Sequence, residues 1–101
     1  MTEPAFFILA ALAGAPQHGY GILGDVEQLS GGRVTLKVGS LYGVLDRLAA
    51  ERLVELDREE PHHGRLRRYF RITDAGRSAL AAEVARQTAN VAAARARLGT
   101  A

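Results

Sequence analysis

Hydrophobic residues in the first half of the chain recur every three or four positions, which is the spacing of one face of an α-helix. The pattern predicts three short helices, over residues 3–13, 18–29 and 39–51. Glycine and proline residues separate these segments, as expected where helices end. The apolar stripe of the first helix is expected to comprise Phe6, Leu9, Ala10 and Ala13. That of the third comprises Leu41, Leu45 and Leu48.

The third predicted helix has a second face made of small or basic residues. Ser40, Gly43, Arg47 and Ala50 fall opposite its leucines. We expect this face to lie outside the hydrophobic core. Its small side chains leave room for another molecule to approach the helix backbone.

Two segments with strand-like alternation follow the third helix, at residues 53–57 and 67–73. The loop between them, residues 59–64, contains Pro61 and Gly64, so we expect an antiparallel hairpin. Three helices followed by a basic two-stranded arm have the geometry of a winged helix-turn-helix, which reads nucleic acid. The predicted fold class is mainly α with a small antiparallel β-hairpin.

A fourth helix is predicted from residue 74 onward, and its pattern resembles a heptad repeat. The apolar seam alternates steps of four and three residues, and most of the surrounding positions are alanine. A core this small cannot cover the far end of such a seam, so the helix of a second subunit is expected to do so. The alternative is a single alanine-rich helix in solvent. We therefore divide the chain into a DNA-binding domain, residues 1–73, and a dimerisation helix, residues 74–101. The expected dimerisation residues are Leu80, Val84, Gln87, Val91, Ala94 and Leu98.

The charge of the chain is unevenly distributed, although its net value is only +2. Residues 1–30 contain three acids and no Lys or Arg, whereas residues 31–71 contain nine Lys or Arg against six acids. Five of those nine are arginines of the predicted hairpin. A local basic patch is typical of a DNA-binding surface, the alternative being a solvated arginine-rich hairpin.

Composition argues against several other classes of protein. The chain has no cysteine, so it can form neither a disulfide nor a thiolate metal site. No apolar stretch approaches the roughly 20 residues that span a bilayer, and the short run of residues 5–13 lacks the basic flank of a signal peptide. No catalytic or nucleotide-binding motif is present, and His62 and His63 lack further ligands at metal-binding spacing. We expect a cytoplasmic protein that is not an enzyme and holds no metal or cofactor.

Several short motifs, in order, resemble the PadR family of bacterial transcriptional regulators over roughly residues 5–82. They are His18-Gly19-Tyr20, Gly39-Ser40-Leu41-Tyr42, Gly64-Arg65, Arg67-Arg68-Tyr69 and Arg71 to Gly76. The family often has proline where this chain has Val38 and Gly43, and a glycine where it has Arg52. If the last position needs a positive φ, either an arginine there is strained or the helix ends differently.

The basic patch and the resemblance together imply a set of DNA contacts. The expected residues are Tyr20, Lys37, Gly39, Ser40, Tyr42, Gly43, Arg47, Arg65, Arg67 and Arg68. Some of them have an alternative role: Ser40 as a helix cap, Tyr42 as packing, and Arg47 as an ion-pair partner of Asp46 or Glu51. Strand alternation sends Arg67 and Arg68 to opposite faces, so not every wing arginine can reach DNA.

The resulting hypothesis is a homodimeric repressor that binds a pseudo-palindromic operator in double-stranded DNA. The resemblance also implies release by a small hydrophobic or aromatic effector, for which Phe6 and Phe7 are candidate contacts if they are not ordinary core. Two other functions stay open at this point: a winged helix that binds a protein partner, and a non-specific DNA-binding protein. The identity of the operator and of the effector cannot be read from the residues.

Overall fold

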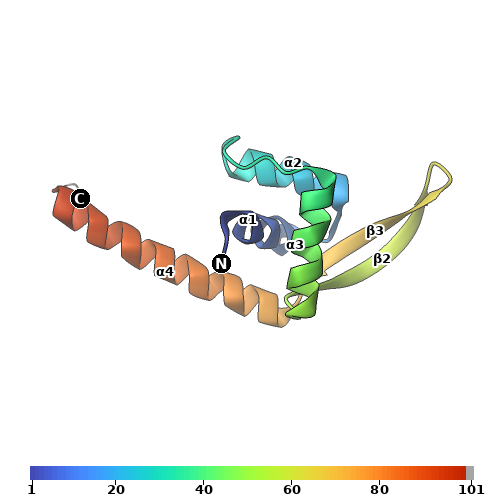
Figure 1. Cartoon of the computed structure of the whole chain (residues 1–101). Helices are drawn as coiled ribbons and strands as arrows, with labels where there is room; N and C mark the ends of the chain where they lie inside the picture. Colours follow the sequence, from blue (N-terminus) through green and yellow to red (C-terminus); the bar gives the residue numbers. More distant parts are fainter. Residues whose placement is uncertain (100–101) are drawn as a thin grey trace.

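A computed structural model describes residues 1–99 as four helices and a three-stranded antiparallel sheet (Figure 1). The elements are α1 (Glu3–Gly14), β1 (Gln17–His18), α2 (Gly19–Leu29), α3 (Val38–Ala50), β2 (Val54–His62), β3 (Arg65–Ile72) and α4 (Asp74–Leu98). The predicted helices are present, with ends shifted by a residue or so. The last two residues of the expected dimerisation segment, 100 and 101, lie outside the described residues.

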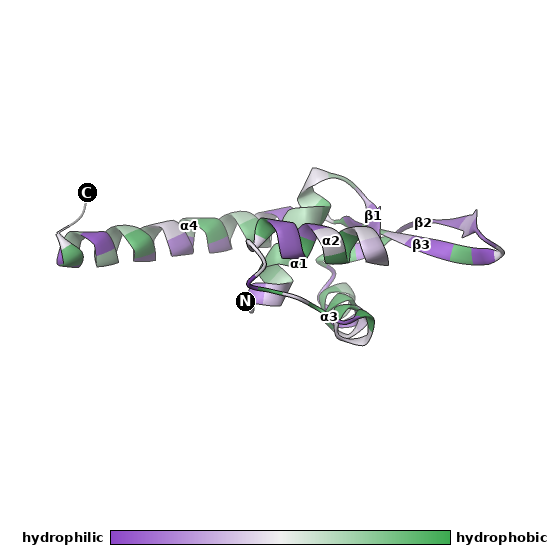
Figure 2. Ribbon diagram, turned by 90° about the horizontal axis from the view of Figure 1, so that it is seen from above, coloured by the Kyte–Doolittle hydropathy of each residue, from purple (hydrophilic) through white to green (hydrophobic). Residues whose placement is uncertain are grey.

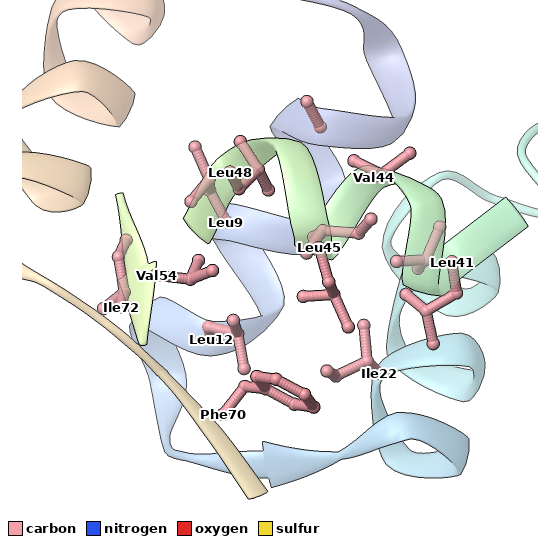
Figure 3. Packing of buried hydrophobic residues seen from close by; sticks show 13 residues of the cluster. Leu9, Leu12, Ile22, Leu41, Val44, Leu45, Leu48, Val54, Phe70 and Ile72 are labelled. Carbon is pink, nitrogen blue, oxygen red and sulfur yellow. The ribbon is translucent and has the colours of Figure 1, made fainter. Parts of the chain in front are cut away.

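The hydrophobic core lies where α1, α2 and α3 meet the base of the hairpin (Figure 3). The predicted leucine stripe of α3 is buried there, and Val44 joins it. These side chains contact Leu12 of α1 and Phe70 of β3 within one cluster. The same helix leaves Ser40, Gly43 and other residues of its second face exposed. The core therefore fixes which side of α3 faces outward.

Only Leu9 of the predicted apolar stripe of α1 is fully buried. The structure buries Ala5, Ile8, Leu9, Ala11 and Leu12, whereas Phe6, Ala10 and Ala13 are only half-buried. Almost every residue of α1 is apolar, so its sequence defines no single face. Packing against α2 and α3 on one side and α4 on another decides which residues are enclosed.

The hairpin is longer than predicted. Most of the expected loop is strand, because β2 continues through Pro61 to His62 and the turn contains only His63 and Gly64, both with positive φ. Proline is tolerated there because β2 is the edge strand of a sheet ordered β1-β3-β2. The register is irregular between Leu56 and Arg58. The two-residue β1, which pairs with β3, is too short to leave a sequence pattern.

A compact junction joins α3, the hairpin and α4. Arg52 has a φ of 61° and ends α3, and the N–H of Leu53 returns to the carbonyl of Leu48 at 2.9 Å. Thr73 caps α4 and donates its hydroxyl to the carbonyl oxygen of Arg52 at 2.7 Å. A Cβ on Gly76 would overlap the carbonyl oxygen of Leu53, so only glycine fits at this contact. The junction holds the hairpin and α4 in place against α3.

Helix α4 packs on the domain as far as Glu83 and then runs away from it. Gly76 is buried and Leu80 packs against the core, but Val84, Val91 and Leu98 are exposed. Figure 2 shows α4 and the hairpin extending in opposite directions from the three-helix body, with hydrophobic and hydrophilic residues alternating along α4. Within residues 1–99, no helix is both long enough and apolar enough to cross a lipid bilayer.

Candidate nucleic-acid interface

A hollow of about 280 Å³ lies between the start of α2, the start of α3 and the wing, the β2–β3 hairpin. Three of the arginines expected to contact DNA and both expected tyrosines meet there, although they come from three separate segments. The lining residues include no carboxylate. They are His18, Gly19, Tyr20, Leu23, Val38, Leu41, Tyr42, His62, Arg65, Leu66, Arg67 and Arg68. We call this surface the basic hollow.

The His18-Gly19-Tyr20 motif shapes one wall of the basic hollow. His18 is the N-cap of α2, and its Nδ1 accepts the N–H of Gly21 at 3.2 Å. A Cβ on Gly19 would lie 2.9 Å from the hydroxyl oxygen of Tyr42, so the glycine leaves room for that hydroxyl. Tyr20 is 73% exposed and unconstrained by the core. The motif therefore has a structural role at its first two positions and presents the third to solvent.

Tyr42 connects the recognition helix to the wing. Its ring lies edge-on to Phe70, with centroids 6.2 Å apart, and is half-buried. The guanidinium carbon of Arg68 lies 5.3 Å from the centroid of Tyr42 and 5.6 Å from that of Phe70. This aromatic pair holds the arginine beside α3 by cation–π attraction. Both expected roles of Tyr42, packing and contact with a ligand, are compatible with this position.

Two of the five wing arginines are bound to acids of the wing itself. Arg58 pairs with Glu60 at 2.6 Å and Asp57 at 2.7 Å, and lies over the ring of Tyr69. Hydrogen bonds to these carboxylates, Glu60 first, raise the pKa of Arg58. Arg71 pairs with Glu55 at 2.8 Å, and that bond raises its pKa likewise.

The other three wing arginines line the basic hollow, although strand alternation predicts opposite faces for Arg67 and Arg68. Arg65, Arg67 and Arg68 form no ion pair within the described part of the chain. Their side chains keep their donors available for an anionic ligand. The fold thus divides the five wing arginines into two that are paired with carboxylates and three that are available to a ligand.

The exposed face of α3 is small along its first two turns. Lys37, Gly39, Ser40 and Gly43 are all exposed. Lys37 occupies the N-cap position without a side-chain cap bond, so Ser40, the third residue of the helix, does not cap it. A Cβ on Gly43 would meet nothing within 4 Å. Packing inside this chain therefore gives no reason for a glycine at that position.

Arg47 lies apart from the basic hollow. It is exposed in the last turn of α3 and lines a different depression, which includes Met1 and Glu51. The alternative expectation of an ion pair with Asp46 or Glu51 is not met among residues 1–99. A contact of Arg47 with the same DNA segment requires the duplex to extend along the whole helix.

A second depression separates α1 from the outer part of α4. Phe6 lines it, whereas Phe7 packs against the core, and the two rings meet edge-on at 5.3 Å. Its α4 wall comprises Val84, Gln87, Thr88, Val91, Ala92 and Arg95. We call this surface the α1–α4 groove. It combines one of the two candidate effector residues with three of the expected dimerisation residues.

Sequence reasoning missed the polar group beside this groove. Glu83 is only 8% exposed, and it accepts hydrogen bonds from Arg86 and from Gln87, the latter at 3.0 Å. These bonds lower its pKa to about 2, so the carboxylate is ionised at neutral pH. A lone glutamate in an alanine-rich helix carries no signal in a single sequence. The sequence also places His62 in a solvated loop, whereas the fold brings it into the basic hollow.

The fold and this surface define the class of the protein. Three packed helices, with the third exposing a small-residue face beside a basic hairpin, make a winged helix-turn-helix. The model of the transcriptional regulator PadR-like family matches residues 8–82. The chain belongs to this family of transcriptional regulators.

Individual proteins resemble this chain in sequence or in fold. A 37.1 kDa protein of transposon TN4556 from Streptomyces fradiae is 49% identical over 82 residues, which cover 81% of this chain but only 22% of the length of that relative. A PadR-like transcriptional regulator of Bacillus cereus has a similar structure, with a TM-score of 0.71 and 25% identity over 96% of this chain and 91% of the other. Bacillus subtilis PadR, solved in complex with operator DNA, gives a TM-score of 0.70 and 21% identity over 79% of this chain and 45% of the other.

Proposed function

We propose that this protein is a sequence-specific DNA-binding regulator that acts in the cytoplasm as a homodimeric repressor. The observation that carries the proposal is the basic hollow, where three arginines without ion-pair partners in the described chain converge with two tyrosines and no carboxylate intervenes. An anionic polymer with regularly spaced phosphates matches such a surface. The operator complex of Bacillus subtilis PadR supports double-stranded DNA as that polymer.

In this proposal the first two turns of α3 enter the major groove. Gly39 and Gly43 allow the helix backbone to approach the bases closely, and the hydroxyl of Ser40 is available to a base edge or phosphate. Arg65 and Arg67 of the wing contact the adjoining backbone or the minor groove. In this arrangement α3 provides sequence specificity, and the wing provides affinity that does not depend on sequence.

The proposed dimer forms through α4. Its exposed valines and Leu98 provide an apolar surface that the described chain leaves uncovered. A two-fold axis at this surface places two α3 helices about one DNA turn apart, roughly 34 Å, and so demands a pseudo-palindromic operator. Derepression by a small hydrophobic or aromatic molecule is part of the proposal, and the α1–α4 groove with Phe6 is the place for it.

A salt titration tests the DNA-binding proposal. Binding of the full chain is measured by fluorescence anisotropy, between about 50 and 200 mM salt, to a duplex from its own promoter and to a random duplex. We expect steep salt dependence together with much tighter binding of the promoter duplex. Arg65→Gln should weaken binding to both duplexes and lower the salt slope by about one.

Arg71→Gln is the matched control, because Arg71 lies in the same strand but is paired with Glu55. It should leave DNA binding unchanged. Equal affinity for both duplexes would indicate a non-specific DNA-binding protein. Absence of binding at low salt would defeat both DNA functions and favour a winged helix that binds an acidic protein partner.

A further inference from the structure

His18 belongs both to the cap of α2 and to the lining of the basic hollow. Its Nδ1 accepts the N–H of Gly21 at 3.2 Å. A neutral imidazole carries a single N–H, so a ring that accepts at Nδ1 holds its proton on Nε2. The cap therefore selects the tautomer in which Nε2 is a hydrogen-bond donor.

The surroundings of His18 favour the neutral ring and fix its orientation. Burial, followed by the charge of nearby Arg67 and by His62, lowers its pKa. The ring lies edge-on to Tyr69, with centroids 5.3 Å apart and planes at 90°. The backbone of His18 also pairs with Tyr69 in the sheet. Within residues 1–99, Nε2 has no side-chain or backbone hydrogen-bond partner, although the ring is half-buried.

We propose that His18 is a further DNA-contacting residue, whose Nε2–H donates to a phosphodiester oxygen of double-stranded DNA bound in the basic hollow. This inference rests on the proposed function. The hollow offers no carboxylate to this donor, and the residues beside it, Arg65, Arg67 and Arg68, are cationic donors themselves. The hydroxyls of Tyr20 and Tyr42 also line the hollow, but neither accepts from Nε2 in the described chain. A bound molecule can therefore supply the acceptor, and a phosphate oxygen is the acceptor those arginines attract.

This contact differs in kind from those of the arginines. A neutral donor releases no counterion, so it adds affinity without adding to the salt dependence. It positions the protein on the backbone and does not discriminate between bases. Its loss should therefore weaken binding to every duplex by the same factor and leave the salt slope as it was.

His18→Asn tests the proposal, because asparagine is a preferred N-cap but its shorter amide does not place a donor at the position of Nε2. We expect the unfolding midpoint of this variant to stay close to that of the wild type. Binding to the promoter duplex and to a random duplex should each weaken about three- to tenfold per subunit, which is the share of one hydrogen bond. His18→Ser, which also caps helices, should give the same loss and serves as the second variant if the asparagine protein is unstable.

The matched control is His63→Asn. His63 lies outside the lining of the hollow, in the wing turn, with a φ of 50° that asparagine tolerates. It should bind like the wild type.

Unchanged binding by the capped His18 variants would overturn the inference while leaving the proposed function intact. A salt slope lowered by about one in the His18 variants would also overturn the inference, because it would show that His18 binds as a cation. A loss of affinity for the promoter duplex alone would overturn it too, because it would show that His18 contacts a base. Failure of the wild type to bind either duplex would refute the proposed function itself.

Discussion

Arg52 sits in the left-handed helical region with a φ of 61°, at the position where the resemblance to the family anticipates a glycine. Two hydrogen bonds hold the backbone in this conformation. The carbonyl oxygen of Arg52 accepts a hydrogen bond from the hydroxyl of Thr73, and the N–H of the next residue, Leu53, donates to the last turn of α3. A residue with a Cβ is strained in this conformation. The expectation of strain at this position is therefore confirmed by its geometry.

Arg52→Gly should stabilise the protein. Relief of the left-handed conformation is worth about 1–2 kcal/mol, and the greater freedom of glycine in the unfolded chain offsets part of that gain. We expect a net increase of about 1 kcal/mol in the free energy of unfolding, measured by urea denaturation at constant slope. Arg52→Ala is the control, since alanine keeps the Cβ and the strain. Equal stability of the glycine and alanine variants would contradict the role of the Cβ.

At the scale of an element, α3 is built with a rigid inner face and an outer face that its own chain does not fill. Leu41, Leu45 and Leu48 are buried, whereas Gly43 meets no neighbour on the outside. Glycine within a helix lowers its stability relative to alanine. A position that is unfavourable for the isolated chain, and unexplained by packing, is consistent with selection for the approach of a ligand.

Gly43→Ala should separate stability from DNA binding. The added methyl group should raise the free energy of unfolding by about 1 kcal/mol through helix propensity. It should also weaken binding to promoter DNA about tenfold, the equivalent of one lost base contact, by keeping α3 out of the groove. Denaturant unfolding and fluorescence anisotropy measure the two effects.

Gly24→Ala is the control for this pair of measurements. Gly24 is an exposed residue within α2, a Cβ at this position would meet nothing within 4 Å, and the residue does not line the basic hollow. The substitution should stabilise by a similar amount and leave DNA affinity unchanged. If Gly43→Ala binds DNA as well as the wild type does, the close approach of α3 to the groove is refuted.

At the scale of the whole molecule, the elongated shape separates two surfaces with different tasks. The principal extents are 57 × 27 × 20 Å, and the wing and the end of α4 extend in opposite directions (Figure 2). The apolar residues of α4 are therefore remote from the basic hollow. A proposed partner at α4 would leave the DNA-binding surface open.

Val91→Lys should convert the proposed dimer to monomers. Val91 is 48% exposed in the single chain, and a dimer would enclose it on both subunits. Loss of two buried valines, at about 1.5 kcal/mol each, should weaken association at least about a hundredfold. Sedimentation velocity measures the change. Ala89→Lys, also exposed but outside the seam and the α1–α4 groove, should remain dimeric. A monomeric wild type would refute the dimer.

Much of the fold could be predicted from the sequence because the helices carry strong local signals. The leucine spacing of α3, the glycines that end helices and the heptad-like seam of α4 depend on residues only a few positions apart. Local signals failed for α1, whose apolar residues surround the whole helix, and for the tip of the wing. Pro61 suggested a loop there, but an edge strand is paired on one side only, and it tolerates proline where the N–H would face solvent.

The sequence by itself therefore determined the four helices, the presence of a hairpin, the inward face of α3 and the excess of arginine in the hairpin. Only the tertiary structure decided which arginines are available. Glu55 reaches Arg71 through the pairing of β2 with β3, whereas Glu60 reaches Arg58 because the segment expected to be a loop is extended strand. The tertiary structure also decided that His18 and His62 share the basic hollow with the available arginines. Helix periodicity depends on residues that are close in the sequence, so a single sequence reveals it. The composition of a site depends on contacts between segments far apart in the chain, and only packing brings these together.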